Sequence, residues 1–209
     1  NVSDEASMKA MATRAFETYG KVDILVNNAM DMSLGAPILK TSVAALDRQY
    51  EVAVRGALLG IQAFVPGMRE RHHGVVTYLA TAFRYPSGPS NYCAVKAATS
   101  SMMASLAMEL GPVKDTGVAV FQFIPTLVGR PRPTPADATA PGCFVRPPSI
   151  IGYGSGPIPP EDCGAALAYC IVRAADIHGS GVNAGQAMKR MKWPFPKPET
   201  TPKKDFDRI

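Results

Sequence analysis

The sequence predicts an α/β fold of three layers, αβα, in which helices cover both faces of a mostly parallel sheet. Short continuous apolar runs alternate along the chain with longer stretches of helical periodicity, and such alternation is typical of parallel sheets. The 209 residues, 46% of them hydrophobic, are enough for one domain with a sizeable core. We expect that domain to span residues 1–192 and a Pro/Lys-rich tail to occupy residues 193–209.

The first helix is expected to begin at Ser3, whose hydroxyl can cap it, and to end at Gly20. Asp4 and Glu5 lie in its first turn, where negative charge is favourable beside the positive end of the helix dipole. The run VDILV that follows, Val22–Val26, is short, apolar and β-branched, which predicts a strand covered on both faces.

A long helical stretch is predicted from about Ser42 to Arg71. Gly56, Gly60 and Pro66 interrupt it, and the missing amide hydrogen of the proline is expected to kink or divide the helix. Further along the chain the same patterns predict strands and helices in alternation: Gly74–Leu79, about Tyr92–Leu110, Gly117–Ile124 and Glu161 to about Arg173. The Pro/Gly-rich residues 130–160 lack regular periodicity, so we expect a substrate loop there.

The formal net charge of +5 sits mostly at the end of the chain, because Lys189–Ile209 holds seven Lys or Arg against three Asp or Glu. The body is nearly neutral, which argues against a nucleic-acid partner. No apolar run approaches the roughly 20 residues that span a bilayer, so no membrane partner is expected. The four cysteines show no CxxC pairing, which favours a reducing, cytoplasmic compartment. The three histidines lack partners at ligand spacing, which argues against a metal site.

Candidate binding residues follow three of the predicted strands. Asn28 and Ala29 come after the first strand, Thr81 after the second and Pro125 after the third. Ligands of parallel α/β sheets bind outside the carboxyl ends of the strands, so these residues are expected to line one crevice. The helix that begins near Tyr92 starts on the same side of the sheet.

Tyr92 and Lys96 form the candidate catalytic pair, because residues four apart lie on one helix face. A nearby ammonium stabilises the phenolate and lowers a phenol pKa that is about 10 when free. Such a tyrosine can exchange a proton with a hydroxyl or carbonyl group near neutral pH, and the Thr81 hydroxyl is a candidate to hold the substrate oxygen. The spacing alone also fits an ordinary surface contact, so its interpretation depends on the rest of the chain.

Four motifs, in this order, resemble the short-chain dehydrogenase/reductase family: LVNNA at Leu25–Ala29, GVVTYLAT at Gly74–Thr81, YCAVK at Tyr92–Lys96 and PTLVG at Pro125–Gly129. The resemblance extends from residue 1 to about Met188. It implies a Rossmann-like sheet that holds NAD or NADP while a hydride passes between the nicotinamide and a carbon of a small-molecule substrate. It also implies a homodimer or homotetramer.

The resemblance assigns roles to particular residues. Tyr92 would donate or accept the proton, Lys96 would bind the nicotinamide ribose and lower the pKa of that tyrosine, and Thr81 stands where the family has a serine. The cofactor-binding residues that the resemblance implies are Asn28, Ala29, Tyr92, Lys96, Pro125 and Val128.

The chain departs from the family pattern at several of the implied positions. The family often has an asparagine whose side-chain amide holds a water of the proton relay, and Ala53 stands at that position, so this amide is absent. Met30 and Thr126 stand where the family has glycine, and they add bulk beside the expected cofactor. The family's glycine-rich phosphate turn and first strands would precede residue 1, so we expect a domain incomplete at its N-terminus. A fragment of a longer enzyme is the favoured explanation, and the alternative is a shortened homologue that covers its sheet edge by association.

Three classes of function remain open. The favoured one is an NAD(P)-dependent oxidoreductase that acts on a secondary alcohol or ketone of a mostly apolar small molecule. The second is a cofactor-independent cyclase, isomerase or dehydratase that uses Tyr92 as acid and base, and the third is a non-catalytic subunit that keeps the fold.

Overall fold

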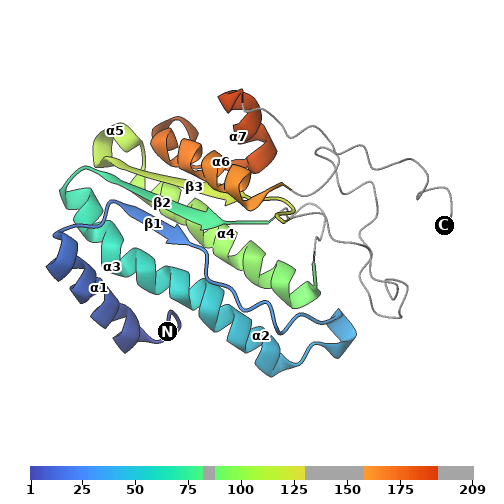
Figure 1. Ribbon diagram of the computed structural model, residues 1–209. Helices are drawn as coiled ribbons and strands as arrows, with labels where there is room; N and C mark the ends of the chain where they lie inside the picture. Colours follow the sequence, from blue (N-terminus) through green and yellow to red (C-terminus); the bar gives the residue numbers. More distant parts are fainter. Residues whose placement is uncertain (82–87, 130–157, 193–209) are drawn as a thin grey trace.

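The computed structural model describes residues 1–81, 88–129 and 158–192, and it contains a four-stranded parallel sheet with helices on both faces (Figure 1). The strands are β1 (Ile24–Asn27), β2 (Gly74–Leu79), β3 (Val118–Ile124) and β4 (Gly181–Asn183), in the spatial order β1-β2-β3-β4. The predicted tail and residues 130–157 of the predicted substrate loop lie outside the described residues.

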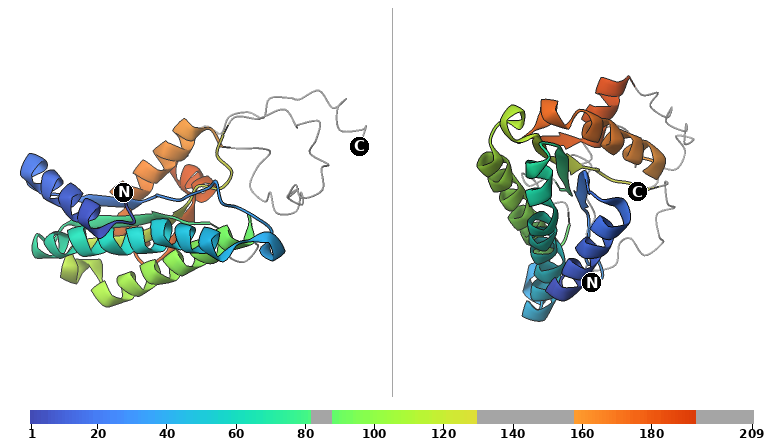
Figure 2. Two further views of the ribbon diagram at one scale, coloured as in Figure 1. Left: turned by 90° about the horizontal axis from the view of Figure 1, so that it is seen from below. Right: turned by 90° about the vertical axis from the view of Figure 1, so that its left-hand side faces the viewer.

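Helices cover the sheet in two layers. The α-helices are α1 (Glu5–Tyr19), α2 (Val43–Tyr50), α3 (Gly56–Glu70), α4 (Ser90–Leu110), α5 (Val113–Thr116), α6 (Pro160–Val172) and α7 (Ala184–Met191). Shorter helical segments are η1 (Ile38–Lys40) and η4 (Ala174–Ile177), both 3₁₀, and the π-helical η2 (Glu51–Arg55). The α1, α3 and α4 helices pack on one face of the sheet and α6 and α7 on the other (Figure 2), which is the predicted three-layer, Rossmann-like arrangement. No helix within the described ranges is long and apolar enough to cross a bilayer.

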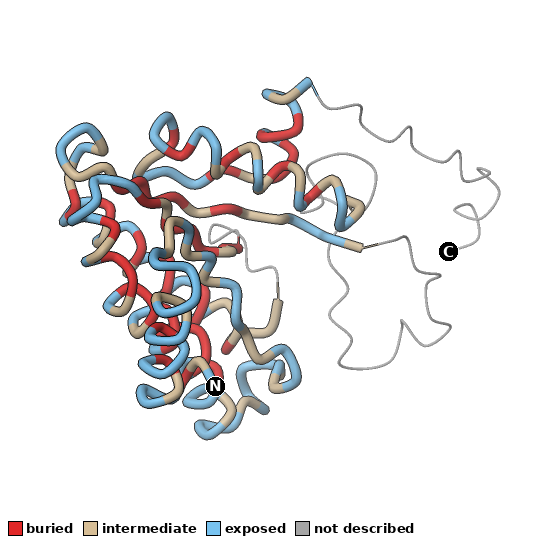
Figure 3. The backbone as a smooth tube through the Cα atoms, turned by 60° about the vertical axis from the view of Figure 1, so that its left-hand side comes forward, coloured by how far each residue is buried: buried red, intermediate tan, exposed pale blue. Residues whose placement is uncertain are grey.

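Side-chain alternation along β2 and β3 divides the core into two clusters. Val76 and Tyr78 face α3 and α4, whereas Phe121 and Phe123 face α6 and α7. All four side chains are almost completely buried, and Figure 3 shows the buried stretches that run along the strands. Burying a side chain the size of phenylalanine stabilises the fold by roughly 1.5–3 kcal/mol, so these central strands anchor both helix layers.

The β1 strand forms one edge of the sheet and is covered on one face only. Leu25 packs toward the α3 layer, but Ile24 and Val26 are 47% and 39% exposed. The prediction of a strand buried on both faces was therefore wrong. The helices α6 and α7 cover β3 and β4 but do not reach β1.

The N-cap of the first helix lies one residue later than predicted. Asp4 caps α1, because its carboxylate accepts a hydrogen bond of 2.7 Å from the backbone N–H of Ser7. Ser3 is buried instead, where its hydroxyl donates to the side-chain oxygen of Asn1 and accepts from Arg48. Both residue types cap helices, and the long-range contact with Arg48 that decides between them is invisible in the local pattern.

The long helical stretch keeps helical backbone angles from α2 through the π-helical η2 into α3. None of the predicted interruptions ends it, because Gly56 has helical φ and ψ, and Gly60 and Pro66 lie inside α3. The apolar face of α3 packs into the core on both sides of Pro66 through Phe64 and Met68, and this packing offsets the lost hydrogen bond. A single π-helical turn is a recurrent way to adjust a helix near a functional site.

The turns before β2 and β3 pack tightly against each other. Gly117 has a φ of +72°, and a Cβ at this position would lie 1.9 Å from the carbonyl oxygen of His72. Its own carbonyl accepts a hydrogen bond of 3.1 Å from the N–H of Gly74. Only glycine fits there, and this contact helps to fix the register that pairs Gly74 with Val118.

Candidate active site

Tyr92 and Lys96 lie one turn apart near the start of α4, as their spacing predicted. Tyr92 is half-buried and Lys96 is only 5% exposed. The Lys96 ammonium donates a hydrogen bond of 2.5 Å to the carbonyl oxygen of Leu79, the last residue of β2. The lysine therefore reaches the carboxyl end of the sheet, where ligands of parallel sheets bind.

Two aromatic rings flank the ammonium. The Nζ atom of Lys96 lies 4.7 Å from the ring centroid of Tyr78 and 5.8 Å from that of Tyr92. Both distances are within the roughly 6 Å over which the negative face of a ring attracts a cation. The charge of Lys96 is thus stabilised by two rings and one carbonyl rather than by a carboxylate.

Burial tunes the charges in this cluster. It lowers the pKa of Lys96 to about 8, because the charged form has lost most of its hydration. It also raises the pKa of Tyr78, so that phenol stays neutral. Near neutral pH the lysine is still mostly charged. Of the two phenols near the ammonium, Tyr92 is the one that remains partly open to solvent.

Thr81 lies just beyond β2, at the same edge of the sheet. It is 9% exposed and follows Leu79, the ammonium's acceptor, by two residues. The three predicted catalytic residues therefore all belong to the segment that ends β2 and the helix that begins at Ser90.

The cofactor-binding candidates at the end of β1 are accessible. Asn28 and Ala29 are exposed directly after the strand. The neighbouring Asn27 has a buried side-chain nitrogen with no hydrogen-bond partner in the described part of the chain. Among the described residues, Lys96 donates one hydrogen bond, to Leu79, and has two further N–H donors. Those donors lie at the carboxyl end of β2 and fit a ligand rich in hydroxyl oxygens.

The segment after β3 is tied to α6. The Pro125 carbonyl accepts a long hydrogen bond of 3.9 Å from the Cys163 thiol, and Val128 pairs with Ile158 in an isolated parallel bridge. Val128 is 40% exposed. Thr126 has a φ of +63°, a left-handed conformation that β-branched residues rarely adopt. The backbone here has the shape that a glycine would favour, although the chain has threonine.

An apolar cluster surrounds Ala53, the residue that stands where the family resemblance implies an asparagine. Ala53 lies in the middle of η2, is 3% exposed, and packs with Val54 and Val95. Met30 packs partly buried against the same cluster.

Two buried amides that were not predicted hold the loop after β1. Asn91 donates a hydrogen bond of 2.8 Å to the carbonyl of Leu34, and Gln49 donates one of the same length to the carbonyl of Asp31. Both amides are 1–2% exposed. Their partners are backbone carbonyls far along the chain, so no local motif signals them. Tyr78 was also missed, although strand alternation places it on the face of β2 that meets α4.

Two cavities within the described residues lie away from these residues. One is lined by residues of α6, η4, β4 and α7, and the other by residues near the ends of α3 and α5. Neither is lined by Tyr92, Lys96 or Thr81. The part of the chain expected to form the substrate loop, residues 130–157, is outside the described residues.

Comparisons with known proteins point in one direction. A model of the short chain dehydrogenase family matches residues 1–137. The chain is 31% identical over 132 residues to (2S)-[(R)-hydroxy(phenyl)methyl]succinyl-CoA dehydrogenase subunit BbsD of Thauera aromatica, covering 63% of this chain and 52% of that protein. It is 28% identical over 163 residues to cyclopentanol dehydrogenase of Comamonas sp. (strain NCIMB 9872), covering 77% of this chain and 63% of that protein.

A solved structure shares the fold. The crystal structure of gox2181 matches with a TM-score of 0.69 at 20% sequence identity, covering 90% of this chain and 74% of that one. The chain spans about half the length of most of the curated relatives it matches.

Proposed function

Because this chain belongs to the short-chain dehydrogenase family, we propose that it acts as an oxidoreductase that transfers a hydride between NAD or NADP and a secondary alcohol or ketone on a mostly apolar small molecule. One observation supports this most strongly. The Lys96 ammonium is buried at the carboxyl end of β2, and it lies 5.8 Å from the ring centroid of a partly accessible tyrosine, Tyr92. That arrangement prepares a phenol for proton transfer.

In this proposal three side chains share the work on the substrate oxygen. Tyr92 gives a proton to the carbonyl oxygen during reduction, or takes one from the alcohol during oxidation. Lys96 stabilises the phenolate form of Tyr92, and the Thr81 hydroxyl holds the substrate oxygen by a hydrogen bond. None of these residues needs to form a covalent bond with the substrate.

The proposed cofactor residues are those at the ends of β1 and β3 and on α4. Asn28, Ala29, Pro125 and Val128 would border the dinucleotide, and the unused donors of Lys96 would bind its ribose hydroxyls. When bound, the nicotinamide ring supplies or accepts the hydride.

We also propose that the protein works as a homodimer or homotetramer on a small-molecule substrate. The family to which the chain belongs supports this proposal, as the resemblance of its motifs implied.

The decisive variant is Tyr92→Phe, which removes one hydroxyl and keeps the ring beside Lys96. Its kcat should fall by roughly 10²- to 10⁴-fold, the usual contribution of a general acid or base. The assay follows nicotinamide absorbance with NADH and NADPH on a panel of cyclic secondary alcohols and ketones, starting from cyclopentanol because a relative acts on it. Tyr19→Phe, an exposed tyrosine on α1, is the matched control and should keep full activity. Substantial turnover by Tyr92→Phe would remove Tyr92 from the mechanism.

The apolar cluster around Ala53 favours a second candidate. Without a relay amide, the site has less means to exchange protons with bulk water, which suits an isomerase, cyclase or dehydratase that uses Tyr92 as acid and base on one substrate. Turnover that needs Tyr92 but no added nicotinamide would select this candidate over the oxidoreductase.

A further inference from the structure

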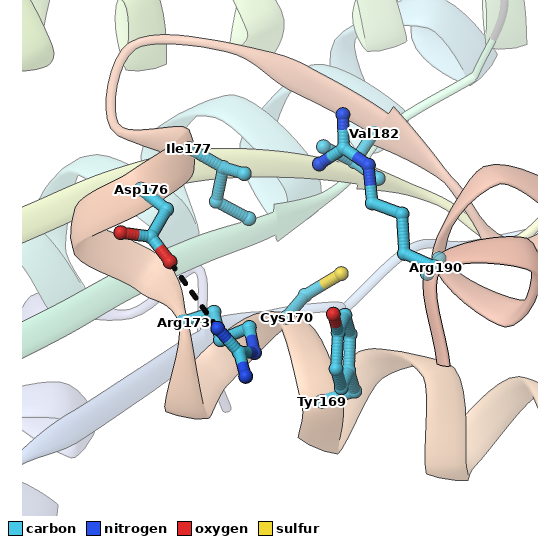
Figure 4. Close-up of a pocket in the computed structure, with 8 residues that line it drawn as sticks. Tyr169, Cys170, Arg173, Asp176, Ile177, Val182 and Arg190 are labelled. Carbon is cyan, nitrogen blue, oxygen red and sulfur yellow. Dashed lines mark ion pairs between the residues drawn. The ribbon is translucent and has the colours of Figure 1, made fainter. Parts of the chain in front are cut away.

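We propose that a cavity on the far side of the sheet from Tyr92 binds a small organic anion, a monocarboxylate with a short apolar chain. The cavity has a volume of about 180 Å³ and lies between α6, η4, β4 and α7 (Figure 4). Its lining residues are Tyr169, Cys170, Arg173, Asp176, Ile177, Val182, Ala187 and Arg190. Because α4 packs on the opposite face of the sheet, this site is separate from the candidate active site.

The floor of the cavity is apolar and belongs to the core. Ile177, Val182 and Ala187 are 8%, 4% and 0% exposed, and all three are part of the cluster between the sheet and α6. Cys170 adds a thiol that is 2% exposed, and burial raises its pKa to about 11, so it stays neutral. A hydrocarbon chain that binds on this floor would transfer its apolar surface from water to an apolar environment, which is favourable.

One of the two arginines at the rim is already neutralised. The guanidinium of Arg173 lies 3.7 Å from the carboxylate of Asp176 and 5.4 Å from the ring centroid of Tyr169. Figure 4 shows this ion pair on one side of the cavity. Because Asp176 balances its charge, Arg173 lines the cavity but is not the expected binding partner of an anion.

Arg190 supplies the unbalanced charge. No carboxylate of the described residues lies within ion-pair distance of it. It stands across the cavity from Arg173 in Figure 4, and its charge acts on the Cys170 thiol, where it opposes the effect of burial on the pKa. The cavity thus carries one net positive charge above an apolar floor.

Size and charge together select the ligand class. A space of about 180 Å³ corresponds to about six water molecules, which excludes nucleotides and long acyl chains. A planar carboxylate matches the two-pronged donor geometry of a guanidinium, and three or four carbons fit the floor. Inorganic phosphate would satisfy Arg190 but leave the apolar floor unused.

The test is a titration of the full chain with sodium butyrate, followed by NMR chemical-shift changes and by calorimetry. We expect saturable binding with a millimolar Kd and shifts centred on Val182 and Ala187. Arg190→Gln should weaken binding at least tenfold. The matched control is Lys189→Gln, which removes the neighbouring positive charge on α7 at a residue that does not line the cavity, and it should bind butyrate as the wild type does.

Two further probes separate the two halves of the proposal. Butan-1-ol keeps the chain and lacks the charge, while sodium phosphate keeps the charge and lacks the chain, so both should bind at least tenfold more weakly than butyrate. The proposal fails if butyrate produces no saturable change, if either probe binds as tightly, or if Arg190→Gln with an unchanged thermal melting curve binds normally. None of these measurements depends on catalytic activity.

Discussion

At the scale of single residues, Lys96 determines the chemistry of the candidate site. Its ammonium has lost most of its hydration and contacts one carbonyl and two aromatic rings instead. Its pKa is lowered because burial destabilises the charged form. In the proposed function, the same buried charge stabilises the phenolate form of Tyr92, so the cost in stability and the proposed benefit for proton transfer have one origin.

This cost predicts a pH dependence of stability. The folded chain releases the Lys96 proton near pH 8, whereas the unfolded chain holds it up to the ordinary value of 10.5. Between these values the unfolded state binds more protons, so raising the pH stabilises the fold. Relative to Lys96→Met, which cannot titrate, the wild type should gain about 2–3 kcal/mol of unfolding free energy between about pH 7 and about pH 10.

Urea unfolding of both proteins at the two pH values measures this gain. The other titrating groups are common to both chains and cancel in the comparison. A stability difference that stays constant with pH would mean that the Lys96 amine is solvated like a surface lysine.

The placement of Tyr92 and Lys96 on one face of α4 could be predicted from sequence, because an i, i+4 spacing fixes which side chains share a helix face. The rest of its surroundings could not. Tyr78 and the Leu79 carbonyl reach Lys96 from a strand 17 or more residues away, and their contact depends on how α4 lies across β2. Asn91 and Gln49 meet backbone atoms, which carry no residue-specific signal.

At the scale of elements, three of the four strands and the longer helices follow local patterns, whereas β4 (Gly181–Asn183) and α7 were not predicted. The sequence places β2 correctly from Gly74 to Leu79, since a short apolar run bounded by a turn fits the length of a buried strand. Neither η2 nor the unbroken course of α3 through Pro66 follows from propensity, because η2 packs against α4 and α3 packs against the sheet.

The turn after β3 yields a prediction about backbone strain. Thr126 is exposed and has a φ of +63°, which costs a β-branched residue roughly 1–2 kcal/mol. Thr126→Gly should therefore raise the unfolding free energy by about 1 kcal/mol, and Thr126→Asn should raise it by less. Thr126→Val keeps the branched Cβ and serves as the matched control, with no expected gain. Thermal and urea unfolding measure the series, and equal stability of the glycine and valine variants would contradict the strain.

At the scale of the whole molecule, the described chain is a sheet with one protected and one open side. Its β4 edge lies under α6 and α7, but β1 presents both an unpaired backbone edge and the apolar side chains of Ile24 and Val26. The family resemblance predicted that β1 would lie at the edge of the sheet. It did not predict that the face of β1 carrying Ile24 and Val26 would be uncovered, because the tertiary arrangement of distant helices decides which strands they cover.

The open β1 edge predicts self-association. In sedimentation velocity at micromolar concentration, the chain should form dimers or larger species, and a variant carrying Ile24→Lys and Val26→Lys should shift toward the monomer. Val172→Lys tests a still more exposed apolar residue on α6, far from the edge, and should leave the distribution unchanged. A monomeric wild type, or a double variant that sediments as the wild type does, would contradict this role for β1.

The contact between Gly117 and His72 limits how this fold can evolve. Most exposed positions around the turn before β3 can accept new side chains at little cost. Position 117 can accept none, because even a methyl group would overlap the neighbouring peptide. Mutational drift can therefore reshape the surface on every side of this turn while the point where the two central strands start stays limited to a single amino acid.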